Sequence, residues 1–544
     1  MKNRYLIVFF ILFLVALVNF WRVPFLFWQQ DEWVTFANLI QSGINITLHG
    51  LDIKSTHFSP ISNFITYLCF KVFGFWPFGY LIIGLVLHLI NGFLVYKIAQ
   101  KLIPNFFYSL IAAVLFVGSS ASYQLLMWPM ISLNAISLTF TLLATLVLIN
   151  FIIKKDRLWF WGTIEAFLSA FSLFTIEYSG GLLLFIPITL LFYYKRLGFA
   201  KITKFLIPLF LFMIFFFWFR FYYTTPLNVA SAPSQTNQNL IIRKSIRYPF
   251  YYLGQIYAPE NIIVQISKII AKTTNTNENL YILKVALVFS VLILLLTFYT
   301  MKKVNLEKYS DSLKIILITF LFIVSSSLPF VLLSGNSGDF TIFPSRYLYF
   351  GSAGGALLLA LLLYYSKVGK VPYIFTALSI LTVTFISLST NQNLQKSKDL
   401  YDKGEIRKSI LETIQSKYPK LPKKTVFYFQ SDTSYYGLPP QERILPFQGG
   451  LGQILLMWYS SKSNFPTKFY QNEYLWDITS ENYMEVEDFG YGYFKSWDKL
   501  QHAIDEHNLP PQSVIAFSWN GETNTLSDIT LQVRKKLQSE NLTK

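Results

Sequence analysis

The sequence predicts a mainly α-helical, polytopic membrane protein with about 11 transmembrane helices and a small extracytoplasmic α/β domain at its C-terminus. Hydrophobic residues make up 53% of the chain and charged residues 14%, whereas soluble domains carry roughly 25% charged residues. Apolar runs of about the length that crosses a hydrocarbon core of roughly 30 Å recur up to Ser389. Beyond Ser389 the chain becomes charged, and short helix and strand patterns follow one another.

The first apolar run, residues 5–20, follows Lys2 and Arg4 and is not followed by a small-residue cleavage site. This pattern predicts an uncleaved anchor with its N-terminus inside. Two of the later runs flank Glu177 and are also compatible with one broken helix. The further expected spans cover residues 80–98, 105–124, 130–153, 158–175, 178–194, 203–222, 280–300, 313–333, 347–365 and 371–389.

Clusters of lysine and arginine lie in alternate loops, and the positive-inside rule places all of them on the side of Lys2 and Arg4. The clusters are Lys97/Lys101, Lys154/Lys155/Arg157, Lys195/Arg196/Lys201/Lys204, Lys302/Lys303/Lys308 and Lys367/Lys370. The net charge of +17 therefore indicates membrane topology and not nucleic acid binding. We predict a multi-pass integral protein of the plasma (cytoplasmic) membrane, with the N-terminus inside and the C-terminal domain outside.

Two domains are expected, a transmembrane domain over residues 1–390, with a first outer loop over 21–78, and an extracytoplasmic α/β domain over 391–544. Within the second domain, helices are predicted at 401–417 and 452–459, and strands at 425–429, 513–519 and 525–533. Its many Tyr and Trp residues fit a core or a seat on the membrane better than a carbohydrate-stacking face.

The first outer loop carries two adjacent carboxylates, Asp31 and Glu32, about ten residues beyond the first span. Trp21, Trp28 and Trp33 bracket them, as aromatic residues do at a membrane–water boundary. Adjacent residues on a helix point roughly 100° apart, so the two cannot share one proton as a dyad. One can act as a base while the other orients or binds. The alternative is that Asp31 is a helix N-cap.

Several basic residues are candidates for holding an anion. Lys54 and His57 precede Ser59-Pro60, which opens a helix-like run, and a helix N-terminus beside such residues suits an anion. The alternative for His57 is a structural role. Arg243 belongs to a basic stretch in the long outer loop 224–279, which suits a phosphate or anionic lipid headgroups, or simply rests on the membrane as a solvated loop.

Arg346 and Arg220 stand at the outer ends of spans. Each either snorkels to the interface or pairs with a phosphate. Glu177, an acid flanked by apolar segments, is a functional candidate by default. His88 is expected to be a packed, hydrogen-bonded helix residue.

The sequence lacks the residues that several other chemistries require. The single cysteine, Cys69, excludes a disulfide or a Cys-based metal site within one chain. No nucleotide-binding GxxxxGK[ST], no HExxH and no GxSxG in a matching context is present. No metal ligands and no cofactor are assigned, and dependence on a divalent metal ion is left open.

Together these features resemble the GT-C class of membrane glycosyltransferases, and within it the branch of protein O-mannosyltransferases and tetratricopeptide-repeat O-mannosyltransferases (glycosyltransferase family 39-like). The matching segments, within roughly residues 1 to 390, are Asp31-Glu32, His57-Phe58-Ser59-Pro60, Phe73-Gly74-Phe75-Trp76-Pro77-Phe78-Gly79-Tyr80, Leu87-His88-Leu89-Ile90-Asn91, Glu177, and Arg346-Tyr347-Leu348-Tyr349 with Ser352. The chain departs from the family at Ile176, where the family often has Lys, and at Asn134, where it often has Arg. It has no tetratricopeptide repeats.

The resemblance implies an inverting, hexosyltransferase-like enzyme. A polyprenyl-phosphate sugar would enter from the bilayer, and a hydroxyl of a protein or of a cell-envelope glycan or lipid would approach from outside. Asp31 would be the general base, and Arg346, with Lys54, His57 or Arg243, would hold the leaving phosphate. The alternatives are a transporter or flippase of a lipid-linked or envelope substrate, although no internal repeat supports it, and an inactive GT-C-fold assembly subunit.

Overall fold

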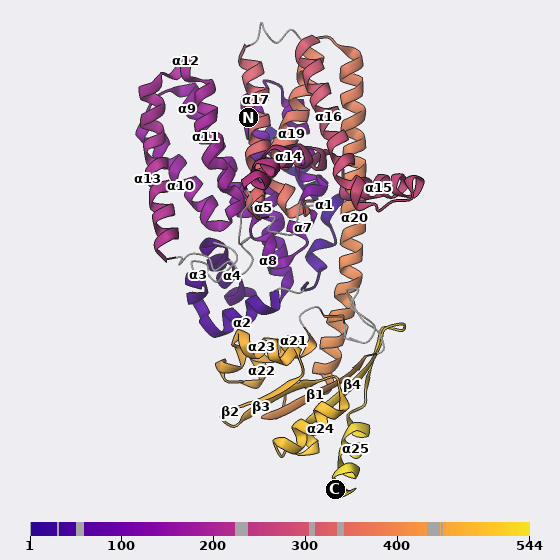
Figure 1. Ribbon diagram of the computed structural model, residues 1–544. Coiled ribbons are helices and arrows are strands. Elements are labelled where there is room, and N and C mark those ends of the chain that lie inside the picture. Colours follow the sequence, from indigo (N-terminus) through magenta and orange to yellow (C-terminus); the bar gives the residue numbers. More distant parts are fainter. Residues whose placement is uncertain are drawn as a thin grey trace. The chain divides into compact units, whose positions relative to one another are not determined.

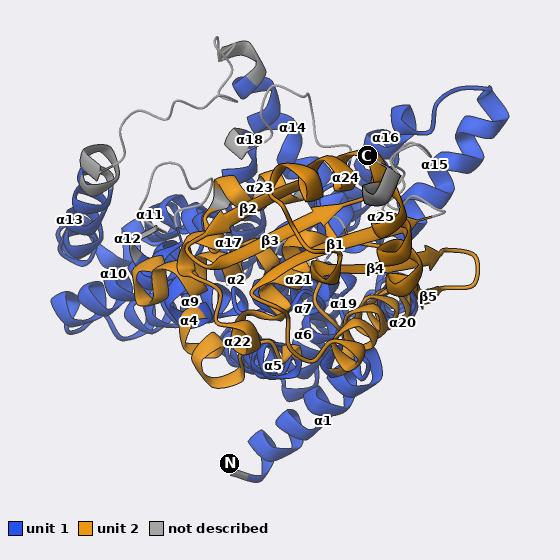
Figure 2. Ribbon diagram, turned by 90° about the horizontal axis from the view of Figure 1, so that it is seen from below, with its two compact units in different colours: residues 1–24, 47–66, 78–398 blue, residues 25–46, 67–77, 399–544 orange. Residues whose placement is uncertain are grey.

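The computed structural model (Figure 1) describes residues 2–29, 32–49, 59–223, 238–303, 310–333, 342–431, 446–447 and 450–543. Contacts divide the chain into two compact units, which are coloured separately in Figure 2. The helical unit contains Met1–Pro24, Thr47–Thr66 and Phe78–Lys398. The mixed unit contains Phe25–Ile46, Tyr67–Pro77 and Asp399–Lys544.

Long helices, most of them apolar, make up most of the helical unit. They are α1 (Lys2–Phe20), α5 (Pro77–Leu102), α6 (Phe106–Val117), α9 (Ala135–Lys154), α10 (Leu158–Thr175), α11 (Leu182–Phe192), α13 (Phe199–Tyr223), α14 (Gln238–Tyr257), α15 (Glu260–Thr274), α16 (Asn279–Lys303), α17 (Ser310–Ser327), α19 (Ser345–Val368) and α20 (Pro372–Lys417). Shorter helices join them, namely α3 (Ile46–His49), α4 (Pro60–Phe73), η3 (Ser120–Ser122), α7 (Tyr123–Leu126), α8 (Pro129–Ser132), η4 (Glu177–Gly181), α12 (Tyr194–Leu197) and α18 (Pro329–Leu333).

The chain is a multi-pass membrane protein by the length and composition of these helices. Among the described residues, nine helices are long and apolar enough to cross a membrane. The count is ten if α6 and the helix after it, bent by 44°, form one span. The expected run 178–194 is a shorter apolar helix, Glu177–Phe192, because Ile176 is extended (φ −160°, ψ 138°) and separates it from α10. About eleven full-length spans were expected, and these two breaks account for the difference.

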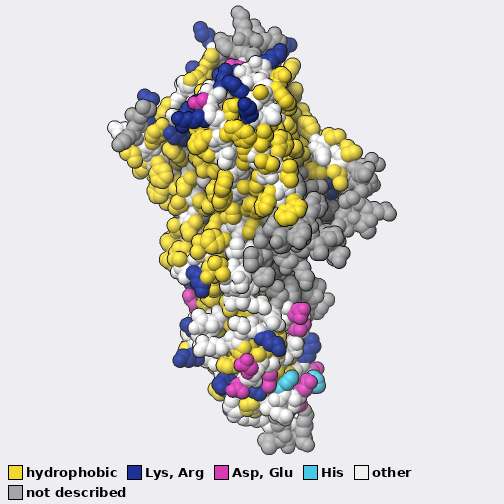
Figure 3. Space-filling model, turned by 90° about the vertical axis from the view of Figure 1, so that its left-hand side faces the viewer, with side chains coloured by type: hydrophobic (Ala, Val, Ile, Leu, Met, Phe, Trp, Pro, Cys, Tyr) yellow, Lys and Arg dark blue, Asp and Glu magenta, His cyan; other side chains and the backbone are white. Residues whose placement is uncertain are grey.

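The outside of the helical unit is apolar. Phe167, Leu191, Leu211 and Ile214 are each more than 60% exposed. Figure 3 shows hydrophobic side chains covering one face of the unit, with Lys and Arg gathered at one end. An apolar belt that ends in basic residues suits a lipid bilayer, and the inside and outside assignment of the loops stays a prediction.

Helix α19 lies at the centre of the helical unit. Of its apolar window, 89% is buried, against 28% for α1. Figure 1 shows α16, α17, α19 and α20 running side by side, with α9, α10, α11 and α13 forming a second group and α15 extending away from the bundle. Gly351 lets α14 approach closely, because a Cβ there would overlap the ring of Tyr252.

The mixed unit contains a five-stranded sheet in the order β2-β3-β1-β4-β5. Its strands are β1 (Lys424–Ser431), β2 (Asn482–Val486), β3 (Phe489–Phe494), β4 (Val514–Asn520) and β5 (Thr525–Asp528). The central β1 is parallel to β3 and β4, and antiparallel hairpins add β2 and β5. Its helices are α2 (Glu32–Ser42), α21 (Leu451–Trp458), α22 (Ser460–Ser463), η7 (Thr467–Tyr470), α23 (Asn472–Thr479), α24 (Trp497–Glu506), η8 (Pro511–Ser513) and α25 (Thr530–Thr543).

The two faces of the sheet are covered by different helices (Figure 1). Val426 and Val514 pack on one face with Leu500 of α24 and Leu537 of α25. On the other face, the Tyr491 hydroxyl donates a hydrogen bond to the Gly452 carbonyl of α21 over 2.7 Å. Alternating side chains thus bury both faces, as β-strand geometry requires.

The predicted elements of the C-terminal region are largely confirmed. Helix 401–417 is the end of the long α20, and 452–459 matches α21 to within one residue. Strand 425–429 lies in β1, and strand 513–519 matches β4 to within one residue. The strand predicted over 525–533 is wrong in its second half. There β5 ends at Asp528, whose Oδ1 accepts a hydrogen bond from the Thr530 N–H over 3.0 Å and so opens α25.

The contacts also divide the chain differently from the predicted boundary at residue 390. Two pieces of the first outer loop, Phe25–Ile46 and Tyr67–Pro77, group with Asp399–Lys544. The reason is long-range packing of α2 against α21 and η7. Apolar periodicity describes only local structure and carries no information on this partner.

Candidate functional site

The described part of the first outer loop is built around buried aromatic rings. We call the rings of Phe27, Trp28, Trp33, Phe36, Phe75 and Trp458 the first-loop cluster. Its closest pairs are Phe36–Phe75 at 4.6 Å and Trp28–Phe36 at 4.8 Å between ring centroids. Trp28 and Trp33 are fully buried, so their assignment to a membrane–water boundary is wrong, whereas Trp21 is 47% exposed. Aromatic rings pack well against one another, and this packing makes the cluster part of a core.

A buried arginine orders the backbone next to this cluster. Arg407 of α20 is 1% exposed. Its Nη1 donates to the carbonyls of Trp28 (3.0 Å) and Gln29 (3.2 Å), and its Nε donates to the Pro446 carbonyl over 3.2 Å. A buried cation needs such partners, and these fix the chain just before the carboxylate pair. Sequence reasoning missed Arg407, which looks like any other charge in a polar helix.

Glu32 is the first residue of α2 and is 1% exposed. A carboxylate at a helix N-terminus is favoured by the helix dipole. Asp31, Lys54 and His57 lie outside the described residues, so their predicted roles stay predictions.

Arg346 lies in the first turn of α19 and has aromatic rings as neighbours. Its guanidinium carbon lies 5.6 Å from the Trp128 ring centroid and 5.2 Å from that of Tyr347. The Tyr347 ring stacks on Phe330 at 4.7 Å and meets Tyr178 edge-on at 4.9 Å. We call these five residues the α19-start cluster.

The structure therefore brings two of the predicted site segments together. Tyr178 follows Glu177 in η4, and Tyr347 follows Arg346 in α19, so the ring contact joins the two segments. Glu177 and Arg346 are both half-buried. Acidic and basic residues at the boundary of apolar helices are default functional candidates.

Hydrogen bonds hold the start of α19 in place. The Tyr252 hydroxyl of α14 donates to the Tyr347 carbonyl over 2.7 Å and accepts from the Gly351 N–H over 3.2 Å. The Ser345 hydroxyl accepts from the Gln124 N–H over 3.0 Å. These contacts fix the backbone on both sides of Arg346.

The predicted anion-binding residue Arg243 is an exposed residue of α14. It lies nine residues before Tyr252, which is about 14 Å along the helix.

A further polar group lies close to Ser345. The Tyr123 hydroxyl donates to Glu260 Oε2 over 2.7 Å, and Lys396 Nζ lies 3.8 Å from Glu260 Oε1. A small cavity is lined by Glu260, Gln255 and Ser345. Sequence reasoning missed Glu260, which lies in the long loop 224–279, and Lys396, which lies in a charged stretch; both are outside the expected spans.

His88 is a hydrogen-bonded core residue, as predicted. Its Nδ1 lies 2.9 Å from the Tyr349 hydroxyl and its Nε2 lies 3.1 Å from the Val117 carbonyl. The Asn91 amide also donates to the Tyr349 hydroxyl, over 3.1 Å. Two segments that carry the family resemblance therefore form one buried network. Its residues satisfy one another and serve packing.

Among the described residues, the remaining candidates form no further cluster. Arg220 lies in α13, and its side chain is outside the described residues. In the part of the chain that the structure describes, no three His, Cys, Asp or Glu side chains are grouped to hold a metal ion. No protein-family model, curated protein or solved structure matches this chain.

Proposed function

We propose that this protein is an inverting membrane glycosyltransferase, which moves a sugar from a polyprenyl-phosphate donor to a hydroxyl acceptor. The observation that carries the proposal is the setting of Arg346. It is a half-buried cation at the first turn of a central apolar helix, surrounded by aromatic rings. Among the described residues it has no carboxylate partner and no hydrogen-bond acceptor. Such a cation has its full donor capacity available for an anion.

The leaving group of the proposed reaction is a lipid phosphate. A guanidinium matches two phosphate oxygens bidentately, and the first-turn N–H groups of α19 favour negative charge at the same place. The donor's hydrocarbon tail would remain in the bilayer beside the apolar exterior. Arg346 would thus stabilise the charge that develops as the anomeric carbon–oxygen bond to phosphate breaks.

The acceptor side of the reaction requires a base. Asp31 would take the proton of the acceptor hydroxyl while that oxygen attacks the anomeric carbon from the face opposite the phosphate. This in-line path inverts the anomeric configuration. The bond network of Arg407 orders the chain up to Gln29, and the buried Glu32 suits a positioning role.

The test is a donor-turnover assay with the full chain in lipid nanodiscs. A polyprenyl-phosphate mannose carrying a radiolabelled sugar is mixed with acceptor peptides or envelope glycans, and transfer to the acceptor is counted. The Asp31→Asn variant should fold normally and lose roughly 10²- to 10⁴-fold in rate, the usual range for a general base. Glu32→Gln should be milder.

Three results would correct or contradict the proposal. Normal turnover by Asp31→Asn together with a dead Glu32→Gln would reverse the two roles. Full activity in both variants would make the loop structural. Movement of the labelled lipid between leaflets without any transfer to an acceptor would indicate a flippase.

A further inference from the structure

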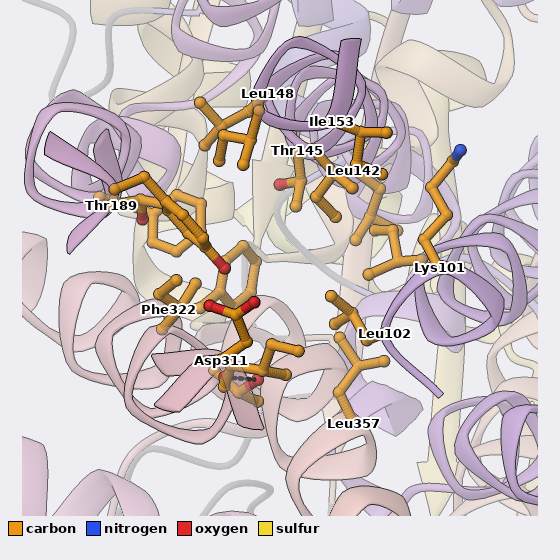
Figure 4. Close-up of a pocket in the computed structure, with 18 of the residues that line it drawn as sticks. Lys101, Leu102, Leu142, Thr145, Leu148, Ile153, Thr189, Asp311, Phe322 and Leu357 are labelled. Carbon is orange, nitrogen blue, oxygen red and sulfur yellow. Dashed lines mark hydrogen bonds between the residues drawn. The ribbon is translucent and has the colours of Figure 1, made fainter. Parts of the chain in front are cut away.

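A cavity of about 200 Å³ lies within the helical unit (Figure 4). Its walls come from α5, α9, α11, α17 and α19 and are mostly apolar, including Leu142, Leu148, Phe185, Phe322 and Leu357. Figure 4 shows Leu142 and Leu148 on one side of this space and Phe322 on the other. An apolar cavity of about 150 Å³ takes up a molecule such as benzene, so this space can hold part of a hydrocarbon chain.

One end of the cavity is charged. Lys101 from the last turn of α5, Arg196 of α12 and Asp311 from the first turn of α17 all line it. Asp311 has its own counter-ion, since Lys314 Nζ lies 3.4 Å from its Oδ1. Lys101 and Arg196 have no carboxylate partner in the part of the chain that is described, and both are exposed. The rim is therefore suited to an anion.

The depth of the cavity matches one leaflet. On α17 its lining runs from Asp311 to Phe322, and on α9 it runs from Ile153 to Leu142. Each stretch covers eleven residue steps, or about 16 Å at 1.5 Å per residue. This is close to half of a hydrocarbon core of roughly 30 Å. A free phosphate would use the rim but not this apolar depth.

A polar atom inside the cavity also lacks a partner. The Thr189 side chain lines the space, is 2% exposed, and its hydroxyl has no hydrogen-bond partner among the described residues. The hydroxyls of Thr145 and Thr319, by contrast, donate to carbonyls of their own helices, at 2.9 and 2.8 Å. An ester oxygen near the head of a lipid would accept from Thr189 at this depth.

We propose that this cavity binds an anionic membrane lipid, whose phosphate headgroup carries a net negative charge, in the leaflet at the Lys101 end of the helical unit. The phosphate contacts Lys101 and Arg196, and one hydrocarbon chain runs between α9 and α17. This site is distinct from the proposed donor site. Gly354 of α19 packs beside Thr319 and Phe322, so Asp311, earlier in the antiparallel α17, lies toward the end of α19 that is remote from Arg346.

The experiment uses photo-crosslinking of the full chain in phosphatidylcholine nanodiscs. Phosphatidic acid with a diazirine in its acyl chain is compared with phosphatidylcholine carrying the same group, and mass spectrometry locates the adducts. We expect phosphatidic acid to label the 142–153 and 311–322 segments preferentially. The double variant Lys101→Gln/Arg196→Gln should lower this labelling about 30-fold, because each cation near the surface contributes roughly 1 kcal/mol and every 1.4 kcal/mol is a factor of ten.

The matched control is Lys195→Gln, an exposed neighbour of Arg196 that does not line the cavity. It should leave labelling unchanged. The substituted side chains are exposed, so folding is expected to be preserved, and thermal unfolding of each variant verifies it. Equal labelling by both lipids, or labelling that the double variant does not lower, would overturn the proposal. The readout does not depend on transferase activity, so its outcome is independent of the proposed function.

Discussion

The mixed unit and the helical unit each place an arginine next to a cluster of aromatic residues, but the two cations have different surroundings. Arg407 is 1% exposed and donates hydrogen bonds to three backbone carbonyls at 3.0–3.2 Å. Arg346 is half-buried, and its described neighbours are the ring faces of Trp128 and Tyr347. A ring face attracts a cation without using up its N–H donors in planar hydrogen bonds. The first arrangement positions the chain, and the second leaves donors available for a ligand.

Substitution of Arg407 should have the largest effect on stability. Replacement by Leu fills a similar apolar volume but leaves the carbonyls of Trp28, Gln29 and Pro446 without their donor. An unsatisfied buried polar group costs roughly 1–3 kcal/mol, so the free energy of unfolding of the mixed unit should fall by about 3 kcal/mol or more. Arg407→Lys should lie between, because one ammonium cannot reproduce the guanidinium fork. Thermal unfolding of the full chain in detergent measures the loss.

Lys403→Leu is the matched control, since Lys403 is an exposed residue one turn earlier on α20. It should leave unfolding unchanged. If Arg407→Leu unfolds at the same temperature as this control, the carbonyl network is not what positions the first loop.

The sequence allowed most of the helical unit to be predicted and much less of the mixed unit. Long apolar runs identify spans directly, because each must be about 20 residues long whatever its neighbours are. The hairpin of β2 and β3 escaped prediction, since Gly490 and Gly492 interrupt the alternation of apolar residues that indicates a strand. The long-range contacts of α2 with α21 escaped prediction for a different reason, because local patterns do not specify a partner.

The residues of the candidate site also fall into two groups, those that the sequence predicted and those that it did not. Arg346 and Glu177 were predicted because a charge at the edge of an apolar run is conspicuous. Arg407 and Lys396 were missed because they lie in polar stretches where charge is ordinary, and Glu260 was missed because it lies in a long loop outside the expected spans. Their importance comes from tertiary contacts, such as the 2.7 Å bond from Tyr123 to Glu260.

At Arg346 we expect a smaller effect on folding and a clear one on chemistry. Arg346→Ala should lower donor turnover about 10²-fold, as loss of one preorganised charge-stabilising group does, and should leave unfolding near that of the wild type. Arg346→Lys should recover part of the rate, since it restores charge without the bidentate fork. The exposed Arg247 of α14 offers a control, and Arg247→Ala should turn over normally. Unchanged kinetics in Arg346→Ala would assign this residue to anchoring at the membrane surface.

The smallest expected effect concerns Glu481, a carboxylate whose hydrogen-bond partners all come from the protein, as those of Arg407 do. The side chain of Glu481 is 9% exposed, and burial alone would raise its pKa. Hydrogen bonds from the Ser496 hydroxyl and from the N–H groups of Lys495 and Ser496, at 2.6–2.9 Å, outweigh burial and lower that pKa. A lowered folded-state pKa means that the carboxylate stabilises the fold above its unfolded pKa of about 4.3. That stabilisation is lost as the pH falls below this value and through the folded-state pKa.

Glu481→Gln should therefore destabilise the β2–β3 hairpin and the start of α24 by about 1 kcal/mol at neutral pH, in line with a hydrogen bond to a charged group after discounting for partial solvent access. The difference from the wild type should shrink as the pH falls below about 4. Hydrogen exchange by mass spectrometry on the full chain follows these segments. Asp488→Asn, at a side chain 82% exposed, is the control and should show no such difference. If the loss of stability in Glu481→Gln stays constant from neutral to acidic pH, the shape of the side chain and not its charge stabilises the β2–β3 hairpin and the start of α24. Glu481 would then not be a buried charge stabilised by hydrogen bonds from the protein, as Arg407 is.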